Sequence, residues 1–223
     1  MIDPYVYPNT EVLVNKFGIR DLEKLLEIEK TITSGAWQDI REGTIKIKKT
    51  FDYEHLKSLH KELFKDIYDW AGKERTVDIS KSDTLFCRAM FIEEEAKRIF
   101  NNLKRDNFLR DIKDKSEFSE KLGEVFLDIN MLHPFREGNG RSQRLFIGDL
   151  AKESGYNLEW SNISKENMIK ISKNDNVKEV AKIFKENLKE INQALEKKNP
   201  LVEKIQARRE NKEQNIYKGL IRK

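Results

Sequence analysis

Apolar side chains recur every three or four positions along most of this 223-residue chain, and only four prolines and ten glycines interrupt them. That spacing places apolar residues on one face of an α-helix, and scarce proline and glycine favour long helices over many short strands. The clearest examples are residues 52–70 and 115–132. We therefore predict a mainly α-helical fold, a bundle whose helices each bury one face in a shared core.

Seven segments carry this spacing and are predicted to be helices. Asp21 is the expected N-cap of the first helix, Ala71-Gly72 ends the second, and Gly155 stops the fifth. The predicted helices are residues 19–33, 52–70, 92–107, 115–132, 140–154, 165–172 and 177–197.

Residues 75–87 have a different pattern, which predicts a short β-hairpin. Thr76, Val77 and Ile79 favour a strand, residues 81–83 favour a turn, and residues 84–86 favour a return strand. Two strands alone are marginally stable in water. The hairpin must therefore pack on the helices or offer its edge to another chain.

The length of the chain suits one large domain, or one domain with a small appendage. Pro200 marks a change in composition, since residues 196–223 hold nine Lys and Arg against four Glu and few apolar residues. We predict a main domain in residues 1–197, followed by a basic helix or tail in residues 198–223. A solvated tail and a docking segment for a partner both remain open.

Charge and cysteine content narrow the classes of function. The chain mixes 43 Lys and Arg with 39 Asp and Glu along its length, so we predict no direct nucleic-acid binding. Its one cysteine, Cys87, excludes an intramolecular disulfide and suits a reducing compartment. No basic leader with an apolar run is visible, and no stretch reaches the ~18 apolar residues of a membrane span. We expect a cytoplasmic protein without membrane association, and delivery by a specialised secretion apparatus stays open.

Residues 133–141 form the most informative segment, because a polar, glycine-rich loop joins two amphipathic helices. Pro134 ends the first helix, since proline cannot continue the hydrogen-bond ladder, and Phe135 is expected to plug into the core and fix the loop. The run Gly138-Asn139-Gly140 stands directly before the next helix. Glycines allow successive N–H groups to converge on an anion, and the helix N-terminus adds unpaired N–H groups.

Charged side chains beside these glycines fit a polyphosphate. Arg141 and Arg144 stand three positions apart, so they share a face of the first helical turn, and guanidinium groups suit phosphate oxygens. Two arginines there oppose the helix dipole unless an anion offsets them. Glu137 is placed to hold a Mg²⁺ ion that bridges phosphates, and His133 is a base alongside. From these residues alone, a phosphate site and a structural turn both stay open.

The twelve residues 133–144 are His-Pro-Phe-Arg-Glu-Gly-Asn-Gly-Arg-Ser-Gln-Arg. They resemble, without a gap, the signature loop of the Fic family, His-x-Phe-x-Asp/Glu-Gly-Asn-Gly-Arg-x-x-Arg. The resemblance continues through residues 7–19 and 70–75 and covers roughly residues 5–195. It implies the Fic fold, a helical bundle with one β-hairpin flap. It also implies a protein adenylyltransferase, which moves AMP from ATP to a Ser, Thr or Tyr hydroxyl of a target protein.

The resemblance implies a role for each residue of the loop. His133 is the expected general base, which takes the proton from the target hydroxyl. Glu137 is the expected ligand of Mg²⁺ at the α- and β-phosphates. Asn139 is expected to orient the α-phosphate, Arg141 to hold the β-phosphate and Arg144 to hold the γ-phosphate. The implied nucleotide-binding residues are Lys81, Ser82, Arg136, Glu137, Gly138, Asn139, Gly140, Arg141 and Arg144.

Residues 75–87 correspond to the flap of the family, whose exposed strand edge would align a segment of the target by main-chain hydrogen bonds. Lys81 and Ser82 at its turn are expected to touch the nucleotide, with a solvated turn residue as the alternative for Lys81. Gly140 favours AMP transfer, because relatives that phosphorylate tend to carry lysine there. Transfer of UMP or phosphocholine, and an inactive Fic-fold binding module, are the alternatives left open.

Fic enzymes are commonly silenced by a helix with the pattern Ser/Thr-x-x-x-Glu-Gly/Asn, whose glutamate pairs with the residue that is Arg144 here. No segment of this chain has that pattern. The resemblance therefore predicts inhibition in trans, by a separate small antitoxin whose glutamate pairs with Arg144, as in bacterial toxin–antitoxin pairs. No residue identifies the target protein.

Overall fold

The computed structural model describes residues 3–81, 84–173 and 176–191. Residues up to 189 belong to one compact unit. Of the second unit, residues 190–223, only residues 190 and 191 are described. The predicted domain boundary at residue 197 and the predicted tail, 198–223, therefore lie outside the described residues.

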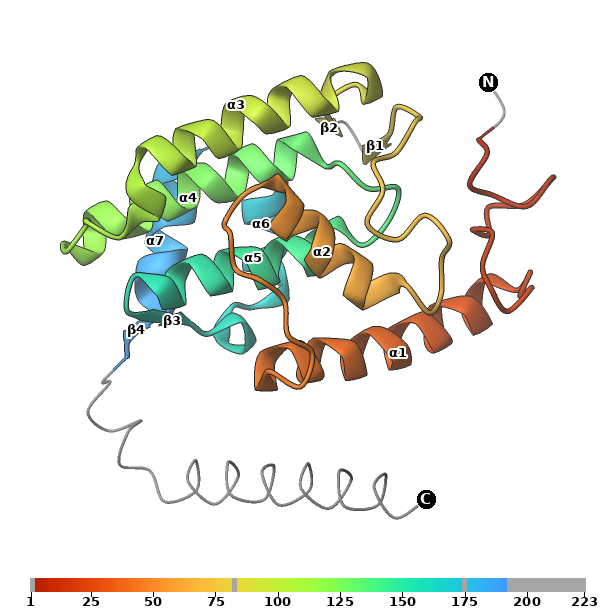
Figure 1. The fold of residues 1–223 in the computed structure, drawn as a ribbon, viewed down its shortest axis with the longest axis horizontal. Helices are drawn as coiled ribbons and strands as arrows, with labels where there is room; N and C mark the ends of the chain where they lie inside the picture. Colours follow the sequence, from red (N-terminus) through yellow and green to blue (C-terminus); the bar gives the residue numbers. More distant parts are fainter. Residues whose placement is uncertain (1–2, 82–83, 174–175, 192–223) are drawn as a thin grey trace, which may run out of the picture. The chain divides into compact units, whose positions relative to one another are not determined.

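Helices dominate the described residues, as predicted (Figure 1). The strands are short, and β1 pairs with β2 in an antiparallel hairpin while β3 pairs with β4. None of the described helices is long and apolar enough to cross a bilayer. The helices are α1 (Leu22–Glu42), α2 (Tyr53–Phe64), α3 (Ile92–Arg105), α4 (Lys115–Leu132), α5 (Asn139–Glu153), α6 (Lys165–Lys173) and α7 (Val177–Asn187). The strands are β1 (Ser80–Lys81), β2 (Thr84–Leu85), β3 (Tyr156–Leu158) and β4 (Leu188–Glu190).

Helix α4 lies at the centre of the packing. It contacts α3, α5 and α7, while α2 lies against α1 and α5 (Figure 1). Phe118, Leu122, Phe126 and Ile129 recur at helical spacing along α4 and are all buried. Because so much apolar surface leaves water along this helix, its C-terminal end is a rigid support for His133, the next residue after the helix.

The first helix confirms its predicted cap and extends beyond its predicted end. The Asp21 side chain accepts a hydrogen bond from the Lys24 N–H, as an N-cap does. The helix continues nine residues past position 33, because Trp37 and Ile40 still pack against the core. It ends at Gly43, whose left-handed backbone (φ 74°) closes the last turn.

Two helices end six or more residues before their predicted ends. Helix α2 stops at Phe64 instead of Trp70, although Ile67 is fully buried in the turns that follow. Helix α7 stops at Asn187 instead of residue 197, because the buried Leu188 begins strand β4, which pairs with β3. In both places the apolar spacing correctly indicated buried side chains. It was wrong about the backbone, which is no longer helical there.

The hairpin is present but its strands are shorter than predicted. Residues 76–79 are not a strand, and the pairing is limited to Ser80 with Leu85 and Lys81 with Thr84. The main chain before β1 bonds to side chains instead. The Thr76 N–H donates to the Tyr5 hydroxyl, and the Val77 carbonyl accepts from Arg75.

Candidate active site

The predicted loop lines a cavity of about 650 Å³. The flap forms part of its wall through residues 78–80 and Phe86. Lys81 lies in strand β1 and Ser82 falls outside the described residues, so their contact with a nucleotide stays a prediction. The other eight predicted site residues all line the cavity: His133, Arg136, Glu137, Gly138, Asn139, Gly140, Arg141 and Arg144.

His133 is held at the C-terminal end of α4. Its N–H donates to the Ile129 carbonyl, and its left-handed backbone (φ 42°) ends the helix. The ring stacks on Phe86 with centroids 3.7 Å apart, and Nδ1 lies 3.0 Å from the carbonyl oxygen of Asn130. Because a carbonyl only accepts, Nδ1 carries the proton and Nε2 carries the basic lone pair. This is a tautomer that serves a general base.

Phe135 and Asn139 close the loop from inside. Phe135 is fully buried, as predicted. Its N–H donates to the Asn139 side-chain oxygen (2.9 Å), and the Asn139 amide nitrogen donates to the Phe135 carbonyl (2.7 Å). The Asn139 side chain is thus engaged with the loop itself at both ends, and its role toward an α-phosphate stays a prediction.

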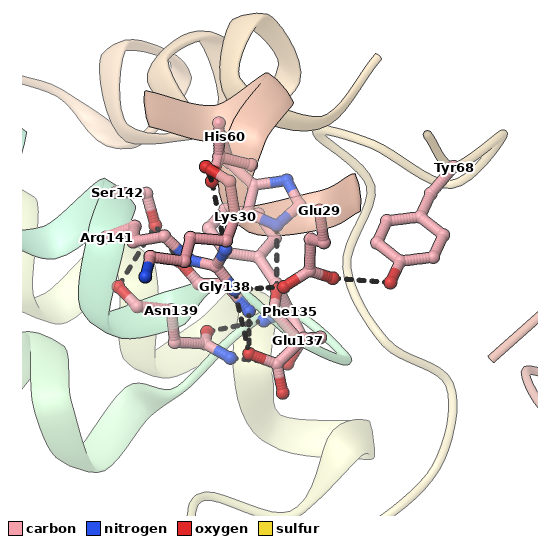
Figure 2. A network of polar contacts seen from close by, with 11 residues as sticks. Glu29, Lys30, His60, Tyr68, Phe135, Glu137, Gly138, Asn139, Arg141 and Ser142 are labelled. Atoms are coloured by element: carbon pink, nitrogen blue, oxygen red, sulfur yellow. Dashed lines mark hydrogen bonds and ion pairs between the residues drawn. The ribbon is translucent and has the colours of Figure 1, made fainter. Parts of the chain in front are cut away.

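His60 on α2 supports the loop from the core side and was not predicted from the sequence (Figure 2). The Gly72 N–H donates to its Nδ1 (2.8 Å), so its Nε2 carries the proton and donates to the Glu137 carbonyl (2.9 Å). The ring stacks on Phe135 at 3.8 Å and on Phe64 at 4.7 Å. Burial lowers the pKa of His60 to about 3, so the ring stays neutral. The sequence did contain a signal for His60, because a histidine in the core-facing row of a helix needs hydrogen-bond partners.

We expect His60→Phe to lower the free energy of unfolding by roughly 2–6 kcal/mol at neutral pH. The Gly72 N–H and the Glu137 carbonyl would lose buried partners, at ~1–3 kcal/mol each. Native His60 has a pKa of about 3, and an unfolded histidine titrates near ~6.5. Wild-type stability should therefore rise with pH across that window, by up to ~1.4 kcal/mol per pH unit from this residue.

Denaturant unfolding at several pH values measures both effects. The variant should lose that part of the pH slope, and equal slopes in the two proteins would contradict the assignment. His55→Phe is the matched control. His55 is equally buried, but its ring packs against Phe51 and Phe146, so its replacement leaves the hydrogen bonds to Gly72 and Glu137 in place.

Arg141 is held in a network that reaches helix α1 (Figure 2). Its guanidinium donates to Glu29 (2.6 Å) and Thr33 (3.1 Å) on α1, and it lies 3.3 Å from Glu137 within the loop. The second carboxylate oxygen of Glu29 accepts from the Tyr68 hydroxyl at 2.5 Å. The guanidinium is therefore fixed in direction before any ligand arrives.

Glu29 was not predicted as a site residue from the sequence. Leu25, Glu29 and Thr33 recur every four residues and form the buried row of α1. A carboxylate in a core-facing row requires a partner, and this was the signal available. Glu29 also changes one expectation. The charge of Arg141 at the start of α5 is offset by carboxylates of the chain itself, so an external anion is not required for its stability.

The other two arginines differ in their surroundings. The Arg144 guanidinium lies 5.8 Å from the ring centre of Trp37, and no carboxylate in the described ranges forms a salt bridge with it. Burial, and then the charge of Arg141, lower the Arg144 pKa. Arg136 lines the cavity but forms a salt bridge with Asp3 at 2.8 Å. A nucleotide that binds Arg136 would therefore have to compete with the carboxylate of Asp3.

Glu137 stands exposed at the mouth of the glycine segment. Its Oε1 accepts from the Gly138 N–H at 2.8 Å, where the backbone has φ 82°. Gly138 to Gly140 lead into α5, whose first N–H groups have no carbonyl one turn earlier to bind. Within the described residues no cluster of three metal-binding side chains exists. One carboxylate does fit a Mg²⁺ ion whose other ligands are phosphates and water.

Comparison with known proteins places these features in one family. Residues 50–150 match the Fic/DOC family. The chain is 42% identical over 173 residues to the protein adenylyltransferase VbhT of Bartonella schoenbuchensis, which covers 76% of this chain but only 35% of that protein. It is 37% identical over 165 residues to the probable protein adenylyltransferase Fic of Escherichia coli, covering 74% of this chain and 80% of that protein.

Solved structures show the same fold. The N-terminal Fic domain of a Bartonella quintana cell filamentation protein with bound ADP superimposes with a TM-score of 0.76 at 28% identity, covering 86% of this chain and 97% of that chain. The BepC protein of Bartonella tribocorum with bound AMPPNP gives a TM-score of 0.73 at 27% identity, covering 83% and 96%. Both structures are of proteins that bind an adenine nucleotide.

Proposed function

This chain belongs to the Fic/DOC family, and from the arrangement of its loop we propose that it is a protein adenylyltransferase that moves AMP from ATP to a hydroxyl side chain of a target protein. One observation carries the proposal. An imidazole with its basic nitrogen at Nε2, two guanidinium groups and the N-terminus of α5 all border one cavity. Adenylyltransferase relatives and nucleotide-bound neighbours support it.

The chemistry follows from the charges around the cavity. The hydroxyl oxygen of the target attacks the α-phosphorus of ATP, and its proton passes to Nε2 of His133. The bond between the α-phosphorus and the bridging oxygen breaks, so AMP stays on the target and diphosphate leaves. Arg141 and Arg144 hold the charge of the leaving diphosphate, and the N–H groups at the start of α5 face the phosphate oxygens.

Mg²⁺ fits this site as a companion of the nucleotide. Glu137 is its expected protein ligand, because its carboxylate is exposed at the cavity and belongs to no preformed metal cluster in the described residues. When bound, the ion neutralises phosphate charge and stabilises the leaving group. Through the ion, Glu137 would hold the phosphate end of the nucleotide, while Gly138 donates its N–H to the same carboxylate.

We expect Glu137→Gln to slow AMP transfer by about two orders of magnitude, the order lost when one charge-stabilising group is removed from an active site. Calorimetry provides a second readout. Wild type should bind ATP more tightly with Mg²⁺ than with EDTA, and the variant should lose that difference. A variant with the full Mg²⁺ dependence would contradict the assignment. Glu11→Gln, outside the residues that line the cavity, is the matched control.

Labelled nucleotides test the function directly. The chain is incubated with cell lysate and either α-labelled ATP, γ-labelled ATP or labelled CDP-choline. We expect label on protein only from α-labelled ATP. Label from γ-labelled ATP would identify a kinase instead, and label from CDP-choline a phosphocholine transferase. Mass spectrometry of the labelled protein then identifies the target and the modified residue.

The flap, residues 75–87, supports a proposal for target binding. Ile79, Ser80 and Phe86 line the cavity, so a peptide paired with the hairpin edge would lie close to His133. The hairpin has two strands, and each leaves an outer edge to which another chain can bond. We expect the target to dock there in extended form, through main-chain hydrogen bonds.

Inhibition by a separate antitoxin is the corresponding proposal for control. A glutamate brought by such a protein would pair with Arg144, which has no salt-bridge partner in the described ranges, and would compete with the γ-phosphate. The activity of the chain alone should exceed its activity with the cognate partner. Equal activities would remove this proposal without affecting the proposed transfer.

A further inference from the structure

Arg75 is a buried arginine whose side chain is surrounded by main-chain carbonyls. It is 2% exposed. Its Nε donates to the carbonyl of His133 at 2.8 Å, and its Nη1 donates to that of Val77 at 2.7 Å. Its Nη2 donates to the carbonyl of Cys87. Its own main-chain N–H donates to Pro134 at 2.8 Å.

This environment is unusual for a charged side chain. Buried arginines are normally paired with a carboxylate, because removing the charge from water is costly. No salt bridge involves Arg75 in the described part of the chain, and burial lowers its pKa. A guanidinium nevertheless stays charged, so the three carbonyl dipoles replace its hydration. Charge-assisted hydrogen bonds of this kind are stronger than neutral ones.

The three carbonyls belong to segments that function needs in one fixed arrangement. Val77 precedes strand β1 and Cys87 follows strand β2, so they are the two ends of the hairpin. The third carbonyl belongs to His133, the proposed general base. The residue before Cys87 is Phe86, whose ring stacks on the His133 ring. One guanidinium therefore ties both ends of the flap to the catalytic residue.

We propose that Arg75 is a positioning residue, which fixes the flap relative to His133 so that a target hydroxyl docked on the hairpin meets Nε2. The inference rests on the proposed function only in its last clause, that the target docks on the flap. The coupling between hairpin and loop is a property of the chain by itself. The guanidinium of Arg75 is a planar fork of donors, which explains why arginine is used here. The single ammonium of lysine cannot reach three diverging carbonyls.

The test compares Arg75→Lys with wild type. Arg110→Lys is the control, because Arg110 pairs with Glu153 and does not line the cavity. We expect Arg75→Lys to bind Mg-ATP within about twofold of wild type. Its transfer of α-label to lysate protein should fall by about 10- to 100-fold, the size of effect that a small displacement of reacting groups produces.

Hydrogen exchange distinguishes this positioning role from a general contribution of Arg75 to stability. The amides of Arg75 and Cys87 are both hydrogen-bonded, to Pro134 and Met131. In Arg75→Lys both should exchange at least about tenfold faster while the amides of α5 stay unchanged. Acceleration throughout the chain, or wild-type exchange at both amides, would overturn the proposal.

A measurement on wild type covers the case in which the variant does not fold. Under increasing denaturant, the main-chain amides of Arg75 and Cys87 and the Arg75 Nε–H should open together, in one cooperative step. Independent opening would overturn the coupling. If wild type transfers no AMP at all, the proposed function fails, and the exchange results still decide whether Arg75 couples flap and loop.

Discussion

Replacing His133 with alanine should slow AMP transfer by about two to four orders of magnitude, the range that a positioned general base contributes. The imidazole is the group at the cavity whose neutral form can accept the hydroxyl proton, and its tautomer is set by the Asn130 carbonyl. Mg-ATP binding should change little, because the residues proposed to hold the phosphates, Gly138 to Arg144, lie at the other end of the loop. Single-turnover transfer of α-label to lysate protein measures the rate, and calorimetry measures the binding.

The fold of the variant must be checked separately, because His133 also stacks on Phe86. His133→Gln is the matched control for packing, since glutamine keeps a polar side chain of similar length and supplies no base. Both variants should show the far-ultraviolet circular dichroism of wild type and nearly the same unfolding midpoint. Transfer at the wild-type rate in either folded variant would refute the role of His133 and leave the phosphate site untouched.

Replacing Gly138 with alanine should destabilise the protein by roughly 2–5 kcal/mol. An added Cβ would lie 2.2 and 2.3 Å from two ring carbons of Phe64, which is fully buried and has no room to move. Overpacking of this kind costs ~1–3 kcal/mol, and the left-handed backbone (φ 82°) adds ~1–2 kcal/mol for a residue with a Cβ. The unfolding midpoint should fall by roughly 4–20 °C.

The control lies two residues away in the same loop. A Cβ on Gly140 would meet only the Arg144 guanidinium, at 3.5 Å, and its φ is not in the left-handed region. Gly140→Ala should therefore be neutral, or more stable by ~0.5–1 kcal/mol because alanine favours the helix. Combining Gly138→Ala with Phe64→Leu should recover part of the loss. Equal stability of the two single variants would show that Phe64 does not confine the loop.

The sequence predicted the parts of the fold that depend on local chemistry. Asp21 capped its helix as expected, residues 115–132 are helical from end to end, and Phe135 is buried. The errors lie where tertiary contacts take over from spacing. Ile67 and Leu188 continue an apolar period, but the chain around them has turned away from the helix to make other backbone bonds.

The site divides in the same way. The residues predicted to bind phosphate line one cavity, and they could be recognised because they are consecutive in sequence. Glu29, His60 and Arg75 were missed, because each is distant from the loop in sequence and meets it only after folding. Each is polar within a buried environment, which indicates that a partner exists without identifying it. The role of Lys81, the tail at 198–223 and the cytoplasmic location stay predictions.

Helix α1 has a consequence for how this site can change during evolution. Its side chains at positions 29 and 33 contact Arg141, and Trp37, one turn further along the helix, contacts Arg144. Both arginines that are proposed to bind phosphate thus contact a single helix, which is distant from the signature loop in sequence. A substitution that shifts or tilts this helix would alter both arginines together, so nucleotide affinity is open to mutational tuning from a region where the chemical motif itself is untouched.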